Sequence, residues 1–198
     1  MSQKQALRNK ILRKRDALPP EIKAEKDKSI QQKLFVLPEF REATTVVLYA
    51  SFRSEVDTLK ILEDALSGGK RIVLPRVDKE RRRLVLYETE GLNELFPGFL
   101  GIPEPQVTGG RERGLDSADL VVLPGAAFDL RGNRLGYGAG YYDILLSEHT
   151  GKMPLVALAY EEQIVHDIPA EKHDIKTDLI ITDRRIIRIE KLSDRWNP

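Results

Sequence analysis

The chain has 198 residues, of which 41% are hydrophobic and 32% are charged, and its net charge at pH 7 is +1. This balance describes a globular protein with a heavily charged surface, and it argues against nucleic acid or an anionic membrane as a partner. The absence of cysteine excludes a disulfide scaffold, a cysteine nucleophile and a thiolate zinc site. No apolar run is long enough for a transmembrane helix, and the N-terminus has no apolar signal core. A cytoplasmic protein is expected.

Two helices are predicted within residues 1–37, packing on the rest of a single domain that spans 1–198. The first covers residues 3 to about 17, and the second starts at Pro20, which suits a first helical turn. Lys4 and Arg8 are four residues apart and share a helix face. Taken alone, this pair is more typical of a solvated surface than of a site.

The next segment reads as strand, loop and helix. Residues 45–50 form a buried strand by their β-branched content, and a helix is expected from Asp57 or Thr58 to about residue 66. Ligands of an open α/β sheet bind in the loops after the carboxyl ends of strands. Ser51 and Glu55 are therefore candidate site residues, although position alone fits an exposed loop acid at Glu55 equally well.

Further strands are predicted at residues 71–75, 83–88, 119–123, 155–159, 179–182 and 186–189, of which 119–123 is central and 186–189 lies at an edge. Because strands and helices alternate, we expect a largely parallel sheet with helices on both faces. Residues 79–83 read as a hairpin tip. The segment 91–105 holds three prolines and three glycines among apolar residues, which suits either a pocket wall or local core packing. The tail 192–198 shows no clear element.

The strongest motif lies between Leu123 and Leu146. Gly136, Gly138 and Gly140 alternate, which lets the backbone direct several N–H groups toward one anion. Arg134 precedes them and can grip phosphate oxygens, and Asp143 follows at a distance that suits a Mg²⁺ ligand. A helix is expected to begin near Ile144. The spacing fits neither a Walker A loop nor a dinucleotide fingerprint, and a tight turn alone would also explain the glycines.

Asp174 is a candidate second acid, whereas His149, His166 and His173 lack the spacing of a metal cluster. No serine–histidine nucleophile pattern is present.

These residues resemble the 5-formyltetrahydrofolate cyclo-ligase family, also called 5,10-methenyltetrahydrofolate synthetase. The segment RLGYGAGYYD from Arg134 carries the resemblance most specifically. Weaker segments arrive in the same order along nearly the whole chain: the pair Lys4 and Arg8, YASFRSEVDT from Tyr49, GKRIVLP from Gly69, GIPEP from Gly101 and HDIKTDLIIT from His173. The resemblance implies a three-layer, Rossmann-like α/β sandwich.

It also implies an activity. ATP and Mg²⁺ would drive the closure of 5-formyltetrahydrofolate to 5,10-methenyltetrahydrofolate, with release of ADP and phosphate. The formyl oxygen would be phosphorylated to an imidate phosphate before N10 attacks. Such chemistry depends on positioning and charge neutralisation more than on a side-chain nucleophile. The implied partners are ATP and a reduced folate, with neither nucleic acid nor membrane, and the protein is expected to be a monomer.

The resemblance assigns roles residue by residue. Arg134 and Tyr142 would be catalytic, and Asp143 and Asp174 would hold Mg²⁺. ATP would be bound by Lys4, Arg8, Arg134, Leu135, Gly136, Tyr137, Gly138, Ala139, Gly140, Tyr141 and Tyr142. The folate would be bound by Ala50, Ser51, Glu55, Tyr137, Gly138, Ala139, Gly140 and Tyr141, with Glu55 bonding the N–H groups of the pterin. Some members carry lysine where this chain has Ala139, so one phosphate contact of those members differs here.

Two alternatives remain open. One is a different enzyme on a similar scaffold that acts on a sugar phosphate or an acyl-CoA and does not need Lys4 and Arg8. The other is a non-catalytic relative that binds a nucleotide or a nucleic acid, of which the net charge disfavours the second.

Overall fold

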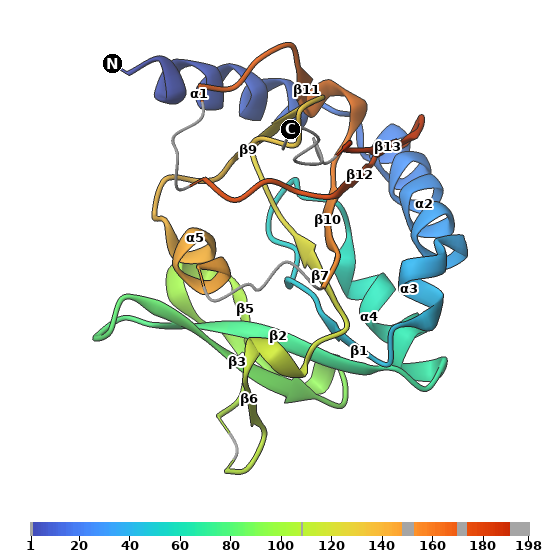
Figure 1. Cartoon of the computed structure of the whole chain (residues 1–198), viewed down its shortest axis with the longest axis vertical. Coiled ribbons are helices and arrows are strands. Elements are labelled where there is room, and N and C mark those ends of the chain that lie inside the picture. The colour runs from blue at the N-terminus through green and yellow to red at the C-terminus, as the bar shows by residue number, and fades with distance from the viewer. Residues whose placement is uncertain (1, 108, 148–152, 170–173, 191–198) are drawn as a thin grey trace, which may run out of the picture.

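The computed structural model describes residues 2–107, 109–147, 153–169 and 174–190, so the tail 192–198 and the histidines at 149 and 173 lie outside the described residues. The main strands are β1 (Thr45–Val47), β2 (Arg71–Asp78), β3 (Arg83–Thr89), β6 (Glu112–Arg113), β7 (Leu120–Leu123), β10 (Leu155–Leu158), β12 (Leu179–Ile181) and β13 (Ile186–Arg188). Within the described residues they form one eight-stranded sheet in the order β13-β12-β10-β7-β1-β2-β3-β6 (Figure 1).

The centre of this sheet is parallel and its edges are antiparallel. Strands β12, β10, β7, β1 and β2 run parallel to one another. Strand β13 pairs antiparallel with β12 at one edge, and β3 and β6 continue antiparallel at the other. The predictions of a largely parallel sheet and of an edge strand near residues 186–189 are confirmed.

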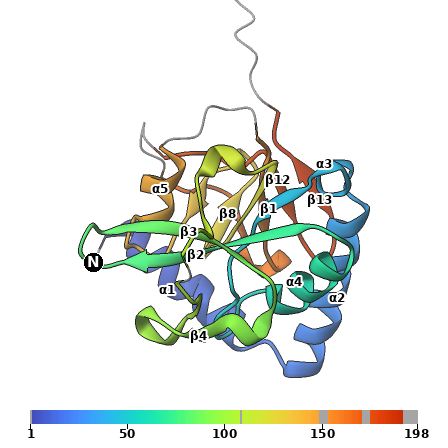
Figure 2. The same ribbon diagram turned by 90° about the horizontal axis from the view of Figure 1, so that it is seen from below.

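Neighbouring residues of a strand point to opposite faces of the sheet, and in the central strands the residues on both faces are buried. Val46, Ile72 and Leu120 face a core that contains the helices α2 (Pro20–Val36), α3 (Pro38–Glu42) and α4 (Thr58–Ser67). Val47 and Val121 face a second core closed by α5 (Tyr141–Leu146). Figure 2 shows α2, α3 and α4 grouped on one side of the sheet and α5 on the other. The expected layers of helix, sheet and helix are thus present.

The sheet is supplemented by smaller elements. A three-stranded sheet combines β8 (Ala127–Asp129), β9 (Arg134–Leu135) and β11 (Ile164–Val165), and β4 (Leu95–Pro97) pairs with β5 (Pro103–Pro105). Single 3₁₀ turns occur at η1 (Leu92–Glu94), η2 (Phe99–Gly101), η3 (Leu115–Ser117) and η4 (Glu161–Gln163). None of these short strands was expected, since two or three residues carry no periodic pattern.

Helix α1 (Gln3–Asp16) lies beside this three-stranded sheet (Figure 1). It begins where the Ser2 hydroxyl accepts a hydrogen bond from the Gln5 amide at 3.2 Å. Its Ile11 is buried against Ala127, Leu135 and Ile168, in a small core separate from the two cores of the main sheet. That contact places the N-terminal helix next to the glycine-rich motif.

Strand β1 is shorter than the predicted strand 45–50. The Leu48 amide still bonds the Val73 carbonyl oxygen at 2.9 Å, after which the chain leaves the sheet. Tyr49 and Ala50 remain buried although they are outside the ladder. An apolar run in the sequence indicates buried residues, and here burial continues past the residues that pair as a strand. The predicted strand is therefore longer than the observed one.

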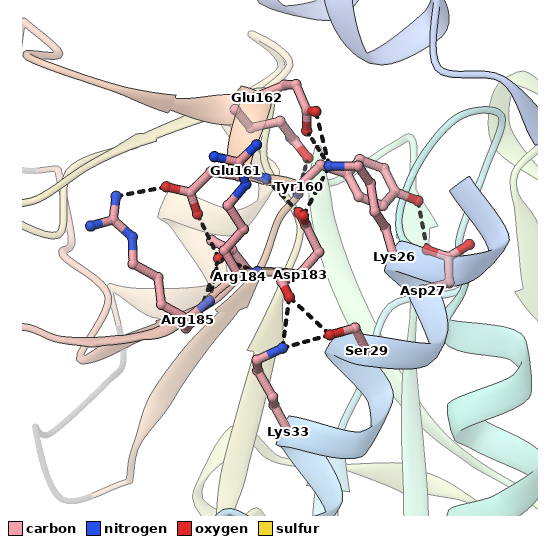
Figure 3. A network of polar contacts seen from close by, with 12 residues as sticks. Lys26, Asp27, Ser29, Lys33, Tyr160, Glu161, Glu162, Asp183, Arg184 and Arg185 are labelled. Atoms are coloured by element: carbon pink, nitrogen blue, oxygen red, sulfur yellow. Dashed lines mark hydrogen bonds and ion pairs between the residues drawn. The ribbon is translucent and has the colours of Figure 1, made fainter. Parts of the chain in front are cut away.

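Helix α2 is tied to the ends of two strands by a polar network (Figure 3). Lys26 Nζ lies 2.9 Å from both Glu162 Oε1 and Asp183 Oδ2. The buried Tyr160 donates its hydroxyl hydrogen to Asp27 Oδ1 at 2.6 Å. Glu162 and Tyr160 follow β10 and Asp183 follows β12, so the network fixes the helix at the carboxyl edge of the parallel strands. Among the described helices, none is long and apolar enough to cross a membrane.

Candidate active site

The start of the glycine-rich motif is a structural turn that positions Arg134. The carboxylate of Asp129 is fully buried, and its Oδ1 accepts the Arg131 and Asn133 amides at 2.9 and 3.0 Å. Its Oδ2 accepts Asn133 Nδ2 at 2.8 Å and the Ile168 amide at 3.1 Å. The turn leads directly into β9, whose first residue is Arg134. This scaffold role of Asp129 was not predicted from the sequence.

The glycines of the motif form a tight loop between β9 and α5. Gly138 and Gly140 have φ angles of +103° and +73°, in the region that side chains with a Cβ disfavour. A Cβ at Gly136 would lie 3.2 Å from a guanidinium nitrogen of Arg134. The prediction that the helix begins near Ile144 is wrong, because the helix starts at Tyr141 immediately after Gly140. Ile144 already donates its amide to the Gly140 carbonyl oxygen at 3.1 Å.

Arg134 is held beneath this loop. Its Nη2 contacts Asp143 Oδ1 at 2.6 Å, and its guanidinium lies 5.6 Å from the centre of the Tyr142 ring. The Arg134 side chain is 4% exposed, whereas that of Asp143 is 39% exposed. Among the described residues the buried Nε of Arg134 has no hydrogen-bond partner, and its Nη1 makes only a 3.4 Å contact with the Pro124 carbonyl oxygen. The guanidinium therefore keeps donor capacity for an anion, which fits a phosphate ligand.

Helix α1 adds two cations from the other end of the chain. Arg8 Nε donates to the Gly136 carbonyl oxygen at 2.8 Å, and its guanidinium would lie 3.6 Å from a Cβ at Gly138. Lys4 Nζ contacts Asp174 Oδ2 at 3.3 Å. Lys4 and Arg8 thus meet residues more than 120 positions away, in contrast to the solvated surface that their spacing alone suggested.

The two predicted metal ligands are each paired with a cation, Asp143 with Arg134 and Asp174 with Lys4. In the part of the chain that the structure describes, no group of three or more acidic or histidine side chains could by itself hold a metal ion. Mg²⁺ usually takes only one or two protein carboxylates, with water and phosphate oxygens as the other ligands. The donor set fits Mg²⁺ bound together with a nucleotide.

The loop after β1 carries the predicted folate residues. The Ser51 amide donates to Thr58 Oγ1 at 2.9 Å, and the Thr58 amide returns a bond to Ser51 Oγ at 3.2 Å. Glu55 is half-buried, and its Oε2 accepts the Phe52 amide at 2.8 Å while its Oε1 accepts the Tyr137 hydroxyl. Burial raises the pKa of Glu55, and the hydrogen bonds from Tyr137 and the Phe52 amide only partly oppose that rise. The predicted folate acid and the glycine loop are therefore in direct contact.

Arg15 contacts the predicted site residue Tyr137, although the sequence did not single it out. It is 5% exposed and donates from Nε to Ser54 Oγ at 3.0 Å and from Nη1 to the Tyr137 hydroxyl oxygen at 2.7 Å. Its spacing from Lys4, Arg8 and Ile11 places all four side chains on one face of α1. That spacing was the available signal, but Arg15 stands in a run of basic residues that reads as solvated surface.

The segment 91–105 contributes aromatic and apolar side chains to the same neighbourhood. The Phe99 ring lies 6.2 Å from the Tyr141 ring, edge to face, and Lys79 Nζ lies 5.2 Å from the centre of the Phe99 ring. A Cβ at Gly101 would contact the Phe52 ring at 3.8 Å. Leu95 packs against the main core, whereas Phe96 is 52% and Leu100 73% exposed. Local core packing thus explains only part of this segment.

Comparisons with known proteins point to one family. The sequence model of the 5-formyltetrahydrofolate cyclo-ligase family matches residues 1–183. The 5-formyltetrahydrofolate cyclo-ligase of Mus musculus is 31% identical, over 91% of this chain and 93% of that protein. The protein of the same name from Escherichia coli is also 31% identical, over 89% of this chain and 98% of that protein.

Solved structures agree as well. The structure of Aquifex aeolicus 5,10-methenyltetrahydrofolate synthetase matches with a TM-score of 0.84 and 31% identity, over 98% of this chain and 100% of that chain. The 5,10-methenyltetrahydrofolate synthetase from Mycoplasma pneumoniae matches with a TM-score of 0.75 and 29% identity, over 92% and 99% of the two chains. The chain belongs to the 5-formyltetrahydrofolate cyclo-ligase family.

Proposed function

We propose that the protein uses ATP and Mg²⁺ to close 5-formyltetrahydrofolate to 5,10-methenyltetrahydrofolate, releasing ADP and phosphate. The observation that carries this proposal is the meeting of three distant segments at one place. Arg8 of α1 binds the Gly136 carbonyl oxygen, and Tyr137 of the same glycine loop binds Glu55 of the loop after β1. Cations for a nucleotide and an acid for a pterin are thus adjacent.

The charge pairs at this place favour a nucleotide bound with its metal. Arg134 pairs with Asp143 and Lys4 with Asp174, so each pair is neutral as it stands. A nucleotide–Mg²⁺ unit carries both signs of charge. Its phosphates can take over the two cations while its metal takes over the two carboxylates, which keeps every charge partnered.

The residues then have separate tasks. Lys4, Arg8, Arg134 and the loop from Leu135 to Tyr142 would bind the phosphates, with Arg134 stabilising the transferring phosphoryl group. Asp143 and Asp174 would hold Mg²⁺, which neutralises charge on the phosphate oxygens. Glu55 would bond the pterin N–H groups, beside Ala50 and Ser51.

The chemistry requires orientation more than acid–base catalysis. The formyl oxygen attacks the γ-phosphorus as the bond to ADP breaks, which turns a poor leaving group into a good one. The nitrogen N10 then attacks the formyl carbon, the carbon–oxygen bond breaks to release phosphate, and N10 loses its proton. Arg134 over the Tyr142 ring and Arg8 on the loop would fix the phosphate against the substrate, and enclosure would exclude water.

The direct test is an absorbance assay with purified protein, ATP, Mg²⁺ and 5-formyltetrahydrofolate. We expect the strongly absorbing methenyl product to accumulate, together with one ADP per product, and no reaction when ATP is omitted. Folded protein that binds ATP without turnover would contradict the proposal and favour a nucleotide sensor. We further propose that the enzyme works as a cytoplasmic monomer, without nucleic acid or membrane partners. The net charge of +1 supports this partner assignment.

A further inference from the structure

The hydroxyl group of Tyr137 lies between a cation and a carboxylate that come from two other segments. Arg15 Nη1 donates to the Tyr137 hydroxyl oxygen at 2.7 Å, and the hydroxyl hydrogen is donated to Glu55 Oε1. Arg15 also holds Ser54, the neighbour of Glu55, through a 3.0 Å bond from its Nε. One tyrosine thus completes a chain of hydrogen bonds from α1 to the loop after β1.

The main chain on either side of Tyr137 belongs to the phosphate-binding part of the site. The Gly136 carbonyl oxygen accepts Arg8 Nε at 2.8 Å, and Gly138 lies against the Arg8 guanidinium. Any movement of Arg8 or of this loop toward a phosphate therefore moves the residue between these two glycines. Its side chain ends on Glu55, so the movement reaches the carboxylate proposed to bind the pterin.

Glu55 is held at both oxygens, by the Phe52 amide at Oε2 and by the Tyr137 hydroxyl at Oε1. A carboxylate offers about four acceptor positions, so two remain for a pair of N–H donors on a ligand. The bond from Tyr137 favours the ionised, accepting form of Glu55 against the effect of burial on its pKa. Burial and the nearby Glu55 charge raise the pKa of Tyr137, which keeps its hydroxyl a donor.

We propose that Tyr137 is a positioning residue that couples the nucleotide site to the folate site. Closure of the glycine loop on phosphate sets the Tyr137 hydroxyl, which in turn orients the Glu55 carboxylate for the pterin. This inference rests on the proposed function for the identity of the two ligands. Because binding couplings are reciprocal, ATP tightens folate binding by the same factor as folate tightens ATP binding.

The test compares the wild type with Tyr137→Phe, which keeps the ring and removes the hydroxyl. Tyr87→Phe in β3, outside this chain of hydrogen bonds, is the matched control. Calorimetry measures 5-formyltetrahydrofolate binding with and without a non-hydrolysable ATP analogue and Mg²⁺. In the wild type and the control, the analogue should tighten folate binding about tenfold, within the usual range of coupling between sites. In Tyr137→Phe this factor should fall to about one, whatever the affinity of this variant for the analogue alone.

A second measurement tests, without folate, whether nucleotide binding reaches the loop that carries Glu55. The Glu55 amide donates to the Phe52 carbonyl oxygen at 3.3 Å and the Phe52 amide to the Glu55 side chain, so hydrogen exchange of these two amides reports the order of the loop. The analogue with Mg²⁺ should slow hydrogen exchange of both amides in the wild type and leave it unchanged in Tyr137→Phe.

Unchanged exchange in the wild type, or an undiminished coupling factor in Tyr137→Phe, overturns the proposal. A purely structural role would lower the melting temperature and leave the coupling factor intact, which also overturns it. Failure of the wild type to form the methenyl product contradicts the proposed function instead, since the exchange measurement needs only the nucleotide analogue.

Discussion

Replacement of Arg134 by glutamine separates a role in phosphoryl transfer from a role in folding. The change removes the 2.6 Å contact with Asp143 and the stacking of the guanidinium on the Tyr142 ring. It leaves a shorter polar side chain, and the pairing of β8 with β9 uses the backbone of residue 134, so the turn at Asp129 and this pairing stay intact. The loss of stability and the loss of rate in this variant can then each be estimated from the contacts that Arg134 makes.

The expected loss of stability is small. Asp143 is 39% exposed, so its ion pair with Arg134 contributes about 0.5–1 kcal/mol after solvent screening. The contact with the Tyr142 ring contributes about 1 kcal/mol. A loss of about 1.5–2 kcal/mol leaves most of the usual stability of about 5–15 kcal/mol. The protein should therefore remain folded.

The expected loss of activity is large, because one charge-assisted donor to a transferring group is worth about 10²–10³ in rate, or about 2.7–4 kcal/mol. The assay is kcat/KM from methenyl formation, beside urea denaturation of the same samples. Arg134→Lys should also stay well below wild type, since an ammonium cannot grip phosphate bidentately. Arg131→Gln, an exposed arginine in the preceding turn, is the control and should keep wild-type activity. Activity of Arg134→Gln within about threefold of wild type would refute the assignment of Arg134 to the phosphate.

Two further predictions concern lysines. Lys4→Met should raise the KM for ATP about tenfold or more and leave the KM for folate unchanged, because a hydrogen bond to a charged group is worth about 1.5–3 kcal/mol. The control is Lys10→Met, since Lys10 is an exposed lysine on the same helix. Lys26→Met should lower the free energy of unfolding by about 1–3 kcal/mol at pH 7, because it leaves the Asp183 and Glu162 carboxylates unpaired. Burial acts to raise the pKa of Asp183, but hydrogen bonds from Lys26 and a backbone amide lower it overall. That stabilisation is fully present above the unfolded pKa of about 4 and is lost as the pH falls through the lower folded pKa. The stabilities of wild type and Lys26→Met in urea denaturation should therefore converge as the pH is lowered below about 4.

Distinct outcomes would contradict these two predictions. An equal rise of KM for ATP in the Lys4 and Lys10 variants would show that the effect reflects overall charge and not a phosphate contact. A gap in stability that does not narrow as the pH is lowered from 7 through the acid range would show that the Lys26 network does not act through its carboxylates.

The parts of the fold that could be predicted are those with a repeating physical signal. The central strands are continuous apolar runs because both of their faces are buried, as at Val46 and Val47. The glycines at 68 and 69 mark the end of α4 as expected. The family, and with it the assignment to a cyclo-ligase, followed from RLGYGAGYYD and its companion segments, and the comparisons confirm it.

The parts that could not be predicted depend on contacts between distant residues. Strands of two or three residues, such as β9 and β11, exist only because they pair with β8 and leave no pattern of their own. Arg15 reads as one more cation in a basic helix until the fold buries it against Tyr137. The start of α5 at Tyr141 depends on the backbone angles of Gly140, which a list of apolar residues does not report.

The small core beneath α1 has a consequence for how activity is lost. Ile11 packs with Ala127, Leu135 and Ile168, apart from the two cores that hold the main sheet. A unit with so few buried contacts can open on its own while the rest of the protein stays folded. Opening would carry Lys4, Arg8 and Arg15 away together, dismantling the cationic wall of the site in one step. Catalytic competence would then be a property of one docked helix, sensitive to heat, proteases or fusion partners that leave the body of the enzyme untouched.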